Sequence, residues 1–418
     1  IGRGDISTTD AEGVMERFRS RLEGVFKEVK QADAEDDSYR KVPFYPAKLG
    51  KDQGTSISRE TMLAIAKAQV TFPEDFSVHK KVRPQLERRA KAIEQGNIDW
   101  ATAESLAFGS LLMEGRNVRV VGQDTRRGTF SQRFAAVVDR QTNAEYVPLK
   151  HLSDDQGQFY VYDSLLSEYA SMGFEYGYSV ASPQALVCWE AQFGDFANGA
   201  QTIADEFISS GFAKWQQKSG VVLLLPHGYE GQGPDHSSAR IERWLQLCSE
   251  GALAVCQPST PASYFHLLRT HTYVNWHRPV VILTPKWMLR HKAAVSQVED
   301  FTNGSWQPAM ADPTIFDPSK VRQVILCTGK IRWELYNERT KRGLEDEVAI
   351  VTLERLYPLP TKELAGILEP LRHVTDVRWV QDEPINQGAY PFLQAALPPA
   401  MAEAMPGHEF AMKVVARP

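Results

Sequence analysis

The sequence predicts an α/β protein: a mostly parallel sheet with helices on both faces, a helical lead-in and a second, smaller α/β domain. From residue 99 onward, short apolar strands alternate regularly with helices. The strand candidates are continuous runs of Val, Leu and Ile, which is typical of strands buried on both faces. A smaller alternation follows residue 321. We expect a helical connector over 1–98, the main domain over 99–300 and the smaller domain over 301–418.

The connector is expected to be helical because its apolar residues recur every three or four positions. A capping box formed by Thr9 and Glu12 would start its first helix. The apolar stripe of that helix contains Met15, Phe18, Leu22, Val25 and Val29. A polar connecting stretch over 31–53 follows, and then helices over 60–69 and 84–95, the second of which Gly96 stops.

In the main domain, Asp99 should cap a helix that runs to Glu114, and a further helix is expected over 131–140. The predicted strands of this domain cover 118–121, 159–162, 185–190, 221–225, 253–257 and 280–283. Residues 287–320 are expected to form a linker. The last domain should contain strands over 321–327, 348–353 and 377–381.

Composition excludes several classes of protein. Lys and Arg number 47 against 52 Asp and Glu, and this net charge of −5 argues against nucleic acid as a partner. The longest apolar runs are far shorter than the roughly 18 residues of a membrane-spanning helix, so no membrane association is expected. The four cysteines lie far apart without any C-x-x-C pair. They indicate a reducing compartment and are expected to be small buried side chains.

Common catalytic and nucleotide-binding motifs are absent. Gly329-Lys330 is not part of a Walker sequence, because Ile331 follows it and Val324 stands where the first glycine is needed. The sequence contains no G-x-S-x-G nucleophile elbow and no H-E-x-x-H pair, and no G-x-G-x-x-G leads from a strand into a helix. No metal-ligand set is therefore predicted in this chain.

Three segments place polar groups or glycines at strand ends, where open α/β sheets bind ligands. The first segment carries Glu168 in the first turns of a helix, between Leu165, Leu166 and Met172. This carboxylate could simply interact favourably with the positive end of the helix dipole. It could also share a proton with a bound heterocycle.

The second segment places Phe193 and Phe196 directly after a strand. They could be core residues, or they could form a face on which a flat ring stacks. Gly194-Asp195 looks like the start of a magnesium and diphosphate motif. That interpretation fails because Phe196 replaces the second glycine.

The third segment is a glycine-rich loop with His227 and His236, which precedes a helix expected to start near Ser237. Histidine can donate, accept or shuttle a proton near neutral pH, so a functional and a structural role are equally open. Metal binding is less favoured, because no third ligand with helical spacing accompanies the two histidines.

Taken together, these segments resemble the carboxyl-terminal part of the thiamine-diphosphate-dependent first component of the 2-oxoglutarate dehydrogenase complex. The resemblance runs through the whole chain. The phrases that carry it are Gly122-Gln-Asp-Thr-Arg-Arg-Gly-Thr-Phe-Ser131, Ser167-Glu-Tyr-Ala with Gly-Phe-Glu-Tyr-Gly-Tyr178, His227 to Glu242, Ser259-Thr-Pro261, and Gln381-Asp-Glu-Pro-Ile-Asn-Gln-Gly388.

The resemblance implies roles for the candidate residues. Glu168 matches the glutamate that contacts N1′ of the cofactor's aminopyrimidine, and Glu175, about two turns further along, is a competing carboxylate. Phe193 and Phe196 match the aromatic pair that packs on the pyrimidine. His236 matches the loop histidine on the substrate side, with His227 as a weaker second candidate. Both histidines would hydrogen-bond the 2-oxo acid.

The resemblance also implies cofactors and partners. Thiamine diphosphate would be bound together with Mg²⁺. The ion would be held by an upstream diphosphate-binding domain, which has no counterpart in this sequence. The enzyme would be a homodimer whose last domain braces the subunits, and it would pass a succinyl group to a lipoyl-bearing succinyltransferase component. The chain is expected to be a fragment or a processed product, located in a bacterial cytoplasm or a mitochondrial matrix. Two alternatives are the same chemistry on 2-oxoadipate and a non-catalytic assembly or regulatory module.

Overall fold

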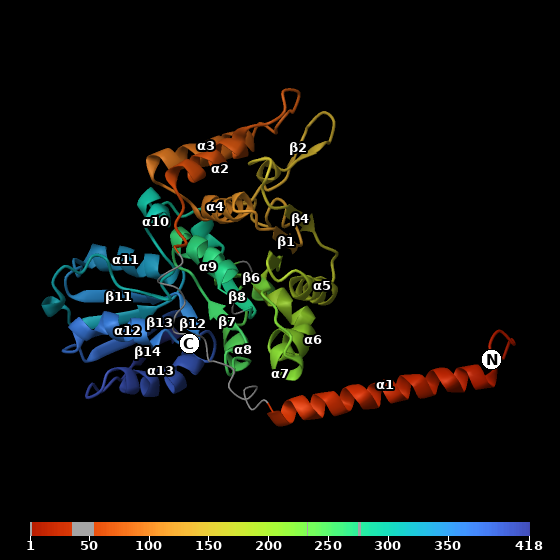
Figure 1. Ribbon diagram of the computed structural model, residues 1–418. Helices are drawn as coiled ribbons and strands as arrows, with labels where there is room; N and C mark the ends of the chain where they lie inside the picture. The colour runs from red at the N-terminus through yellow and green to blue at the C-terminus, as the bar shows by residue number, and fades with distance from the viewer. Residues whose placement is uncertain (1, 36–53, 232, 275–276) are drawn as a thin grey trace. The chain divides into compact units, whose positions relative to one another are not determined.

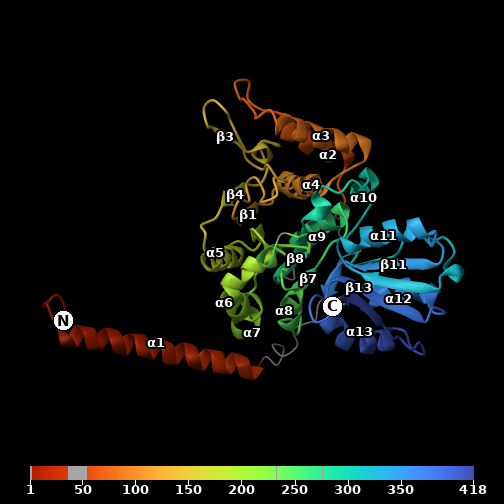
Figure 2. The ribbon, with the colours of Figure 1, turned by 180° about the vertical axis from the view of Figure 1, so that it is seen from behind.

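The computed structural model describes residues 2–35, 54–231, 233–274 and 277–418. The chain divides into two units, Ile1–Pro46 and Ala47–Pro418, which are described separately. Figures 1 and 2 show the ribbon from opposite sides. No helix in these described ranges has the length and apolar composition that a membrane span requires.

The first unit contains one long helix, α1 (Thr8–Glu35). Its predicted apolar stripe is present and exposed. The predicted capping pair is wrong: the helix starts one residue before Thr9, and the capping contacts are made by Ser7. Ser7 Oγ accepts a hydrogen bond from the Asp10 amide at 3.0 Å, and the Asp10 carboxylate accepts from the Ser7 hydroxyl at 2.5 Å. The connecting stretch predicted over 31–53 falls mostly outside the described residues. Its first five residues, 31–35, belong to α1, so the prediction is wrong there.

The second unit begins with three helices that the sequence predicts correctly: α2 (Arg59–Val70), α3 (Arg83–Gln95) and α4 (Trp100–Met113). Gly96 ends α3 in the left-handed conformation, with φ of +76°. Asp99 caps α4, because its Oδ1 accepts a hydrogen bond from the Thr102 amide at 2.8 Å.

The main sheet has seven strands in the order β12-β7-β8-β6-β5-β1-β4. All neighbouring strands are parallel except β12, which pairs antiparallel with β7. The bounds are β1 (Val118–Gly122), β4 (Phe159–Asp163), β5 (Leu186–Glu190), β6 (Val222–His227), β7 (Ala254–Cys256), β8 (Val280–Pro285) and β12 (Arg355–Tyr357). The six predicted strands are all present.

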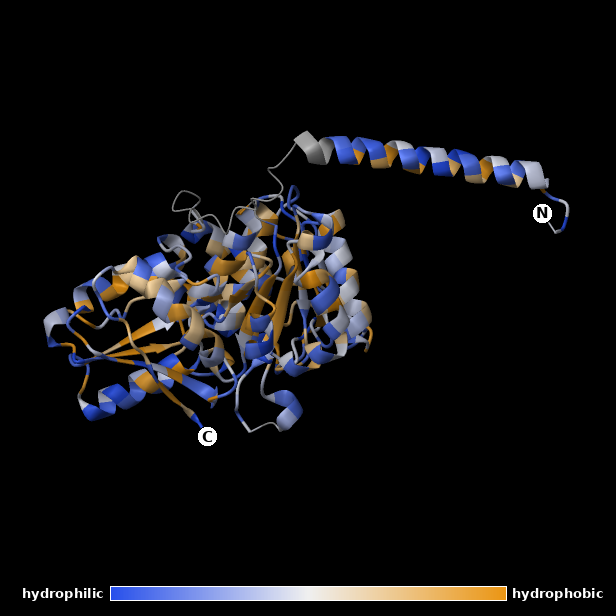
Figure 3. Cartoon of the chain, turned by 90° about the horizontal axis from the view of Figure 1, so that it is seen from below, coloured by the Kyte–Doolittle hydropathy of each residue, from blue (hydrophilic) through white to orange (hydrophobic). Residues whose placement is uncertain are grey.

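Helices cover both faces of this sheet, as predicted. One face, which includes Trp189 and Leu223, packs on α5 (Glu168–Ala181), α6 (Gln201–Ile203) and α8 (Ile241–Gln246) in one apolar cluster. The opposite face includes Glu190, which Arg133 links to α4, and α4 packs on α9 (Pro261–Tyr273). Figure 3 shows the apolar strands in the interior.

The second sheet has the order β14-β13-β10-β11-β9, parallel except for the edge strand β9. Its strands are β9 (Ala309–Met310), β10 (Gln323–Cys327), β11 (Val348–Leu353), β13 (Asp376–Pro384) and β14 (Lys413–Arg417). The accompanying helices are α11 (Ile331–Arg342), α12 (Thr361–Leu368) and α13 (Tyr390–Ala404). The α/β class with a second α/β domain and a helical lead-in is thus confirmed.

The remaining elements are short. They are a hairpin of β2 (Val137–Val138) and β3 (Glu145–Tyr146), the helices α7 (Gly211–Trp215) and α10 (Val298–Thr302), the π-helix η4 (Ala204–Ile208), and the 3₁₀ turns η2 (Pro148–Lys150), η3 (Gly194–Ala200), η5 (Pro234–His236), η6 (Trp287–Leu289), η7 (Pro318–Lys320) and η8 (Glu369–Leu371). Cys188, Cys256 and Cys327 are buried free thiols, as predicted, while Cys248 is half-buried.

Three local predictions are wrong. No helix forms over 131–140, because Ser131 and Phe134 have φ of +51° and +50°, which a right-handed helix does not allow. The helix expected near Ser237 begins only at Ile241. The predicted linker over 287–320 contains α10 and contributes β9 to the second sheet.

The boundary predicted at residue 300 stays a prediction. The two sheets share one apolar cluster, and β12 from the predicted second domain completes the first sheet. The two α/β parts therefore interlock along a common core.

Candidate functional site

The candidate residues lie at one edge of the main sheet. Gln123 follows β1, Phe193 follows β5, His227 ends β6 and Lys286 follows β8. These four strands are parallel neighbours, so their carboxyl ends meet at the same edge. That edge is where ligands bind in open α/β sheets.

Glu168 is the first residue of α5. Ser167 caps this helix through a hydrogen bond from the Ala170 amide to Ser167 Oγ at 3.2 Å. Gln123 Nε2 donates to Glu168 Oε1 at 2.7 Å and to the Leu166 carbonyl at 2.9 Å, which fixes the carboxylate beside the end of β1. The other oxygen faces η3: a Cβ added to Gly199 would lie 3.4 Å from Glu168 Oε2.

Three partly exposed rings form a cluster beside η3. The centroids of Phe193 and Phe196 are 5.6 Å apart with the rings tilted by 65°. The His236 ring stands edge-on to both, at 4.3 Å from Phe193 and 5.6 Å from Phe196. Phe130 packs edge-on against Phe193 at 5.6 Å. The structure thus brings both predicted phenylalanines together with the predicted loop histidine.

The loop that carries His236, called here the histidine loop (residues 227–231 and 233–240), packs closely on the start of η3. A Cβ at Gly194 would lie 2.4 Å from the Cβ of Ala239 and 2.7 Å from the Pro226 carbonyl oxygen, so only glycine fits there. Arg240 Nε donates to Asp195 Oδ1 at 2.7 Å. This charge-assisted hydrogen bond holds the far end of the loop against η3.

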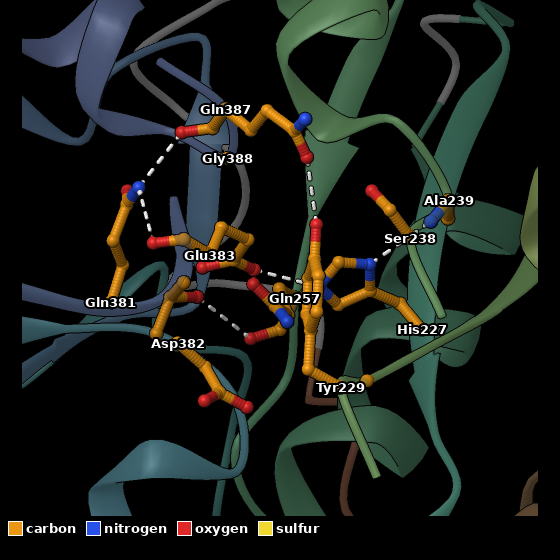
Figure 4. Close-up of polar contacts among 12 residues, drawn as sticks. His227, Tyr229, Ser238, Ala239, Gln257, Gln381, Asp382, Glu383, Gln387 and Gly388 are labelled. Carbon is orange, nitrogen blue, oxygen red and sulfur yellow. Dashed lines mark hydrogen bonds and ion pairs between the residues drawn. The ribbon is translucent and has the colours of Figure 1, made fainter. Parts of the chain in front are cut away.

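His227 is buried, in contrast to His236. Its Nε2 lies 2.6 Å from Glu383 Oε1, and its Nδ1 accepts a hydrogen bond from the Ala239 amide at 3.0 Å. Figure 4 shows the Glu383 carboxylate, which comes from β13, pointing at the His227 ring from the side opposite Ala239. Both ring nitrogens are therefore engaged by the protein.

Lys286 is a buried cation under the same loop. Its Nζ donates to the carbonyl oxygens of Gly228 at 2.7 Å and His236 at 2.5 Å. Burial lowers the pKa of Lys286, an effect that the nearby Glu230 carboxylate opposes. The lysine thus fixes the main chain of the histidine loop at Gly228 and at His236, on either side of Gly231 and Gly233.

Glu175, the competing carboxylate, is occupied elsewhere. Arg119 donates to both of its oxygens, at 2.6 Å and 2.9 Å, and the Glu175 side chain is almost fully buried. Burial raises the pKa of Glu175, and the hydrogen bonds from Arg119 work against that rise.

Sequence reasoning assigned no role to Gln123, Phe130, Lys286 or Glu383. Gln123, Phe130 and Glu383 stand in phrases that carry the family resemblance, which was the available signal. Lys286 had no such signal, because its importance comes from carbonyl oxygens that lie 58 and 50 residues away in the chain.

Comparison with known proteins identifies similar bacterial enzymes. The chain is 49% identical over 421 residues to the multifunctional 2-oxoglutarate metabolism enzyme of Mycolicibacterium vanbaalenii, which covers 97% of this chain and 34% of that protein. It is 50% identical over 402 residues to the 2-oxoglutarate dehydrogenase E1/E2 component of Corynebacterium glutamicum, covering 95% and 33%. It is also 48% identical over 431 residues to the multifunctional 2-oxoglutarate metabolism enzyme of Mycobacterium sp. (strain JLS), covering 100% and 33%.

The chain spans about a third of the length of these curated relatives. Residues 96–292 match the transketolase pyrimidine-binding domain, and residues 295–418 match the 2-oxoglutarate dehydrogenase C-terminal domain. The predicted resemblance is thereby confirmed. Over residues 96–418 the chain therefore resembles the part of 2-oxoglutarate dehydrogenases in which a transketolase-type pyrimidine-binding domain precedes the characteristic C-terminal domain.

Proposed function

We propose that this chain supplies the pyrimidine-binding half of an active site that oxidatively decarboxylates 2-oxoglutarate with thiamine diphosphate. The observation that carries the proposal is the juxtaposition of Phe193, Phe196 and His236 beside η3, the element that Glu168 Oε2 faces. The names of the similar proteins favour 2-oxoglutarate over 2-oxoadipate as the substrate.

The residues at this edge fit an aminopyrimidine ring. Phe193 and Phe196 offer partly exposed aromatic faces, on which a flat ring can pack. Gly199 has no side chain to crowd Glu168 Oε2. Glu168 would hold the cofactor's ring nitrogen and share a proton with it. Thiamine diphosphate, when bound, supplies the carbanion chemistry of decarboxylation.

The protein's own groups would orient the substrate. His236 is half-buried, and its ring is held in place by contact with Phe193 and Phe196. Such a ring can donate a hydrogen bond to the 2-oxo acid as negative charge develops. The aromatic residues around it, Phe130 included, would exclude water from the reacting atoms.

The remaining partners complete the reaction. An upstream portion of the enzyme would hold the diphosphate through Mg²⁺. The product succinyl group would pass to a lipoyl-bearing succinyltransferase component. CO₂ would leave the substrate before that transfer. In the transfer the S–S bond of the lipoyl group would break, with one sulfur taking the succinyl group as a thioester and the other becoming a thiol. The bacterial relatives support a cytoplasmic location.

An exposed apolar surface supports a homodimer. The strand β4 lies at the edge of the main sheet, and the side chains around it and α5 are large, apolar and exposed. They are Tyr162, Leu165, Leu166, Tyr169 and Phe174, with Leu165 and Leu166 each 81% exposed. Surfaces of this kind mark protein–protein contacts. A second subunit seated there would approach the Glu168 end of α5.

The replacement Glu168→Gln tests the assignment in the complete polypeptide that contains this chain. We expect loss of 2-oxoglutarate decarboxylation by at least about a hundredfold, because removal of a general acid or base typically has that effect. Folding should be nearly unchanged, since Gln keeps the shape of the side chain. The matched control is Glu94→Gln on the exposed face of α3, which should leave turnover unchanged.

Near-normal turnover of the Glu168→Gln variant would disprove the role of this carboxylate. If the unaltered protein does not release CO₂ from 2-oxoglutarate in the presence of thiamine diphosphate and Mg²⁺, the alternative of a non-catalytic module is favoured instead.

A further inference from the structure

Two loops from the two family domains meet above the carboxyl edge of the main sheet. One is the histidine loop, and the other is the segment 381–388, which contains the last residues of β13 and the turn that follows them. Besides the contact between Glu383 and His227, Tyr229 donates a hydrogen bond to Gln387 Oε1 at 2.7 Å. The Gly388 amide donates to Glu242 Oε2 at 2.9 Å, just beyond the histidine loop. The 381–388 segment therefore touches the start of the histidine loop at His227 and Tyr229 (Figure 4), and it also contacts Glu242 just after the end of that loop.

The hydrogen bonds of His227 determine which nitrogen carries the proton. The Ala239 amide is a donor, so Nδ1 must be the acceptor and cannot carry a proton. Nε2 must then be protonated, and it donates to the Glu383 carboxylate at 2.6 Å. The neutral His227 ring therefore connects the Glu383 carboxylate to the backbone of Ala239, twelve residues further along the chain.

The histidine loop depends on such anchors because its own backbone is permissive. Gly231 and Gly233 have φ of +80° and +102°, in the region that glycine adopts readily. Lys286 holds the carbonyl oxygens of Gly228 and His236 from below. His227 and Glu383 hold the two ends of the loop together from the side of the second domain.

We propose that Glu383 is a positioning residue, which fixes the ring of His236 against Phe193 and Phe196 by acting through His227. This inference rests on the proposed function, because it assigns to the C-terminal domain a direct part in shaping the substrate side of that site. His227 then orients the loop and does not touch the substrate. Glu383 is one of several residues that link the two domains, and in this role it takes no part in the chemical reaction.

The test uses the complete polypeptide with Glu383→Ala, which leaves the His227 N–H without its acceptor. Amide hydrogen exchange should accelerate by about tenfold or more across the histidine loop, because the loop loses a charge-assisted hydrogen bond. The value of kcat/KM for 2-oxoglutarate should fall by about tenfold, while the affinity for thiamine diphosphate should stay within about twofold, since Glu168, Phe193 and Phe196 are untouched.

Two further variants separate positioning from general stability. Glu383→Gln retains an oxygen that accepts from Nε2, so it should restore slow exchange and most of the lost kcat/KM. Glu383→Asp keeps the charge but withdraws it by one methylene, so it should loosen the loop partially even if the alanine variant does not fold. Glu403→Ala, on the exposed face of α13 in the same domain, is the matched control and should change neither readout.

Unchanged exchange in the histidine loop of both Glu383→Ala and Glu383→Asp would overturn the inference. So would acceleration that spreads evenly over the whole C-terminal domain, because that would be a loss of stability alone. If the unaltered protein proves inactive on 2-oxoglutarate, the proposed function fails, yet the exchange measurements still decide whether Glu383 positions the loop.

Discussion

Arg133 Nη1 lies 2.6 Å from Glu190 Oε2 at the end of β5, and the same guanidinium donates through Nε to Glu104 Oε1 on α4 at 2.6 Å. All three side chains are buried. Thr125 and Tyr264 donate further hydrogen bonds to the two carboxylates. Two buried carboxylates therefore share one guanidinium directly beneath the edge of the sheet that carries the candidate site.

Replacement of Arg133 by Met should destabilise the protein strongly. Methionine fills much of the same volume but leaves Glu104 and Glu190 as neighbouring buried charges without compensation. Removing one partner from a buried ion pair typically costs about 3–5 kcal/mol of the free energy of unfolding. Urea unfolding of both proteins, followed by circular dichroism at pH 7, measures the difference.

Arg140→Met is the matched control, because Arg140 belongs to the same segment but its side chain is exposed. Its free energy of unfolding should change by no more than about 0.5 kcal/mol. An equal loss of the free energy of unfolding in the two variants would show that the buried ion pairs of Arg133 do not stabilise the protein beyond an ordinary surface residue.

Gly194→Ala should displace the histidine loop. The new methyl group would lie 2.4 Å from the Cβ of Ala239 and 2.7 Å from a backbone carbonyl oxygen, so the loop has to move. His236 would then leave its place against Phe193. We expect decarboxylation by the complete enzyme to fall by about a hundredfold, in line with the effect of a misplacement of about 1 Å at a reacting centre.

Gly366→Ala provides the contrasting case. Gly366 lies in α12, is exposed, and would have open space around an added methyl group. Alanine there should leave turnover unchanged and raise the free energy of unfolding by about 0.5–1 kcal/mol, because alanine favours the helix. A similar loss of activity in both glycine variants would contradict the steric explanation.

The sequence predicted the regular elements well where a local signal marks them. Asp99 before an apolar helix and Gly96 after the preceding one are such signals, and both act as expected. The central strands β5, β6, β7 and β8 are buried on both faces, and their continuous apolar runs predicted this. Phe193, Phe196 and His236 were singled out in the sequence, and the structure places their rings together.

Features that depend on distant partners could not be predicted in this way. The segment over 131–140 looks helical, but Arg133 is drawn to two carboxylates on separate elements and its neighbours take up left-handed conformations. The strand β12 is only three residues long and belongs to the sheet of the other domain. The hydrogen bond between His227 and Glu383 joins residues 156 positions apart, so no local sequence pattern could predict it.

Asp139 gives a prediction about acid stability. Its carboxylate accepts hydrogen bonds from the amides of Ser77, Thr142 and Gln141, which together lower its pKa to about 2. In the unfolded chain the pKa is about 3.9, so the stabilisation is complete above about pH 4 and is lost as the pH falls toward 2. Asp139→Asn should therefore be less stable than the unaltered protein at pH 6, and the difference should shrink below pH 4.

Urea titrations of the two proteins between pH 6 and pH 3 measure this effect. If the difference in the free energy of unfolding does not change with pH over this range, the pKa of Asp139 is not lowered in the folded protein.

Leu165→Asp should weaken association of the subunits while leaving each subunit folded. Leu165 is 81% exposed and lies between the edge strand β4 and α5, so a charge there costs the isolated chain little. In a dimer built on this surface, the aspartate would be buried without a partner, which typically costs several kcal/mol. We expect the dissociation constant measured by sedimentation to rise by at least about a hundredfold, with a parallel loss of decarboxylation at low protein concentration.

Phe316→Asp, at a side chain that is 90% exposed in the C-terminal domain, is the control and should leave association unchanged. Unaltered association of the Leu165→Asp variant would exclude this surface as the contact between subunits, because burial of the unpaired carboxylate would weaken any such contact.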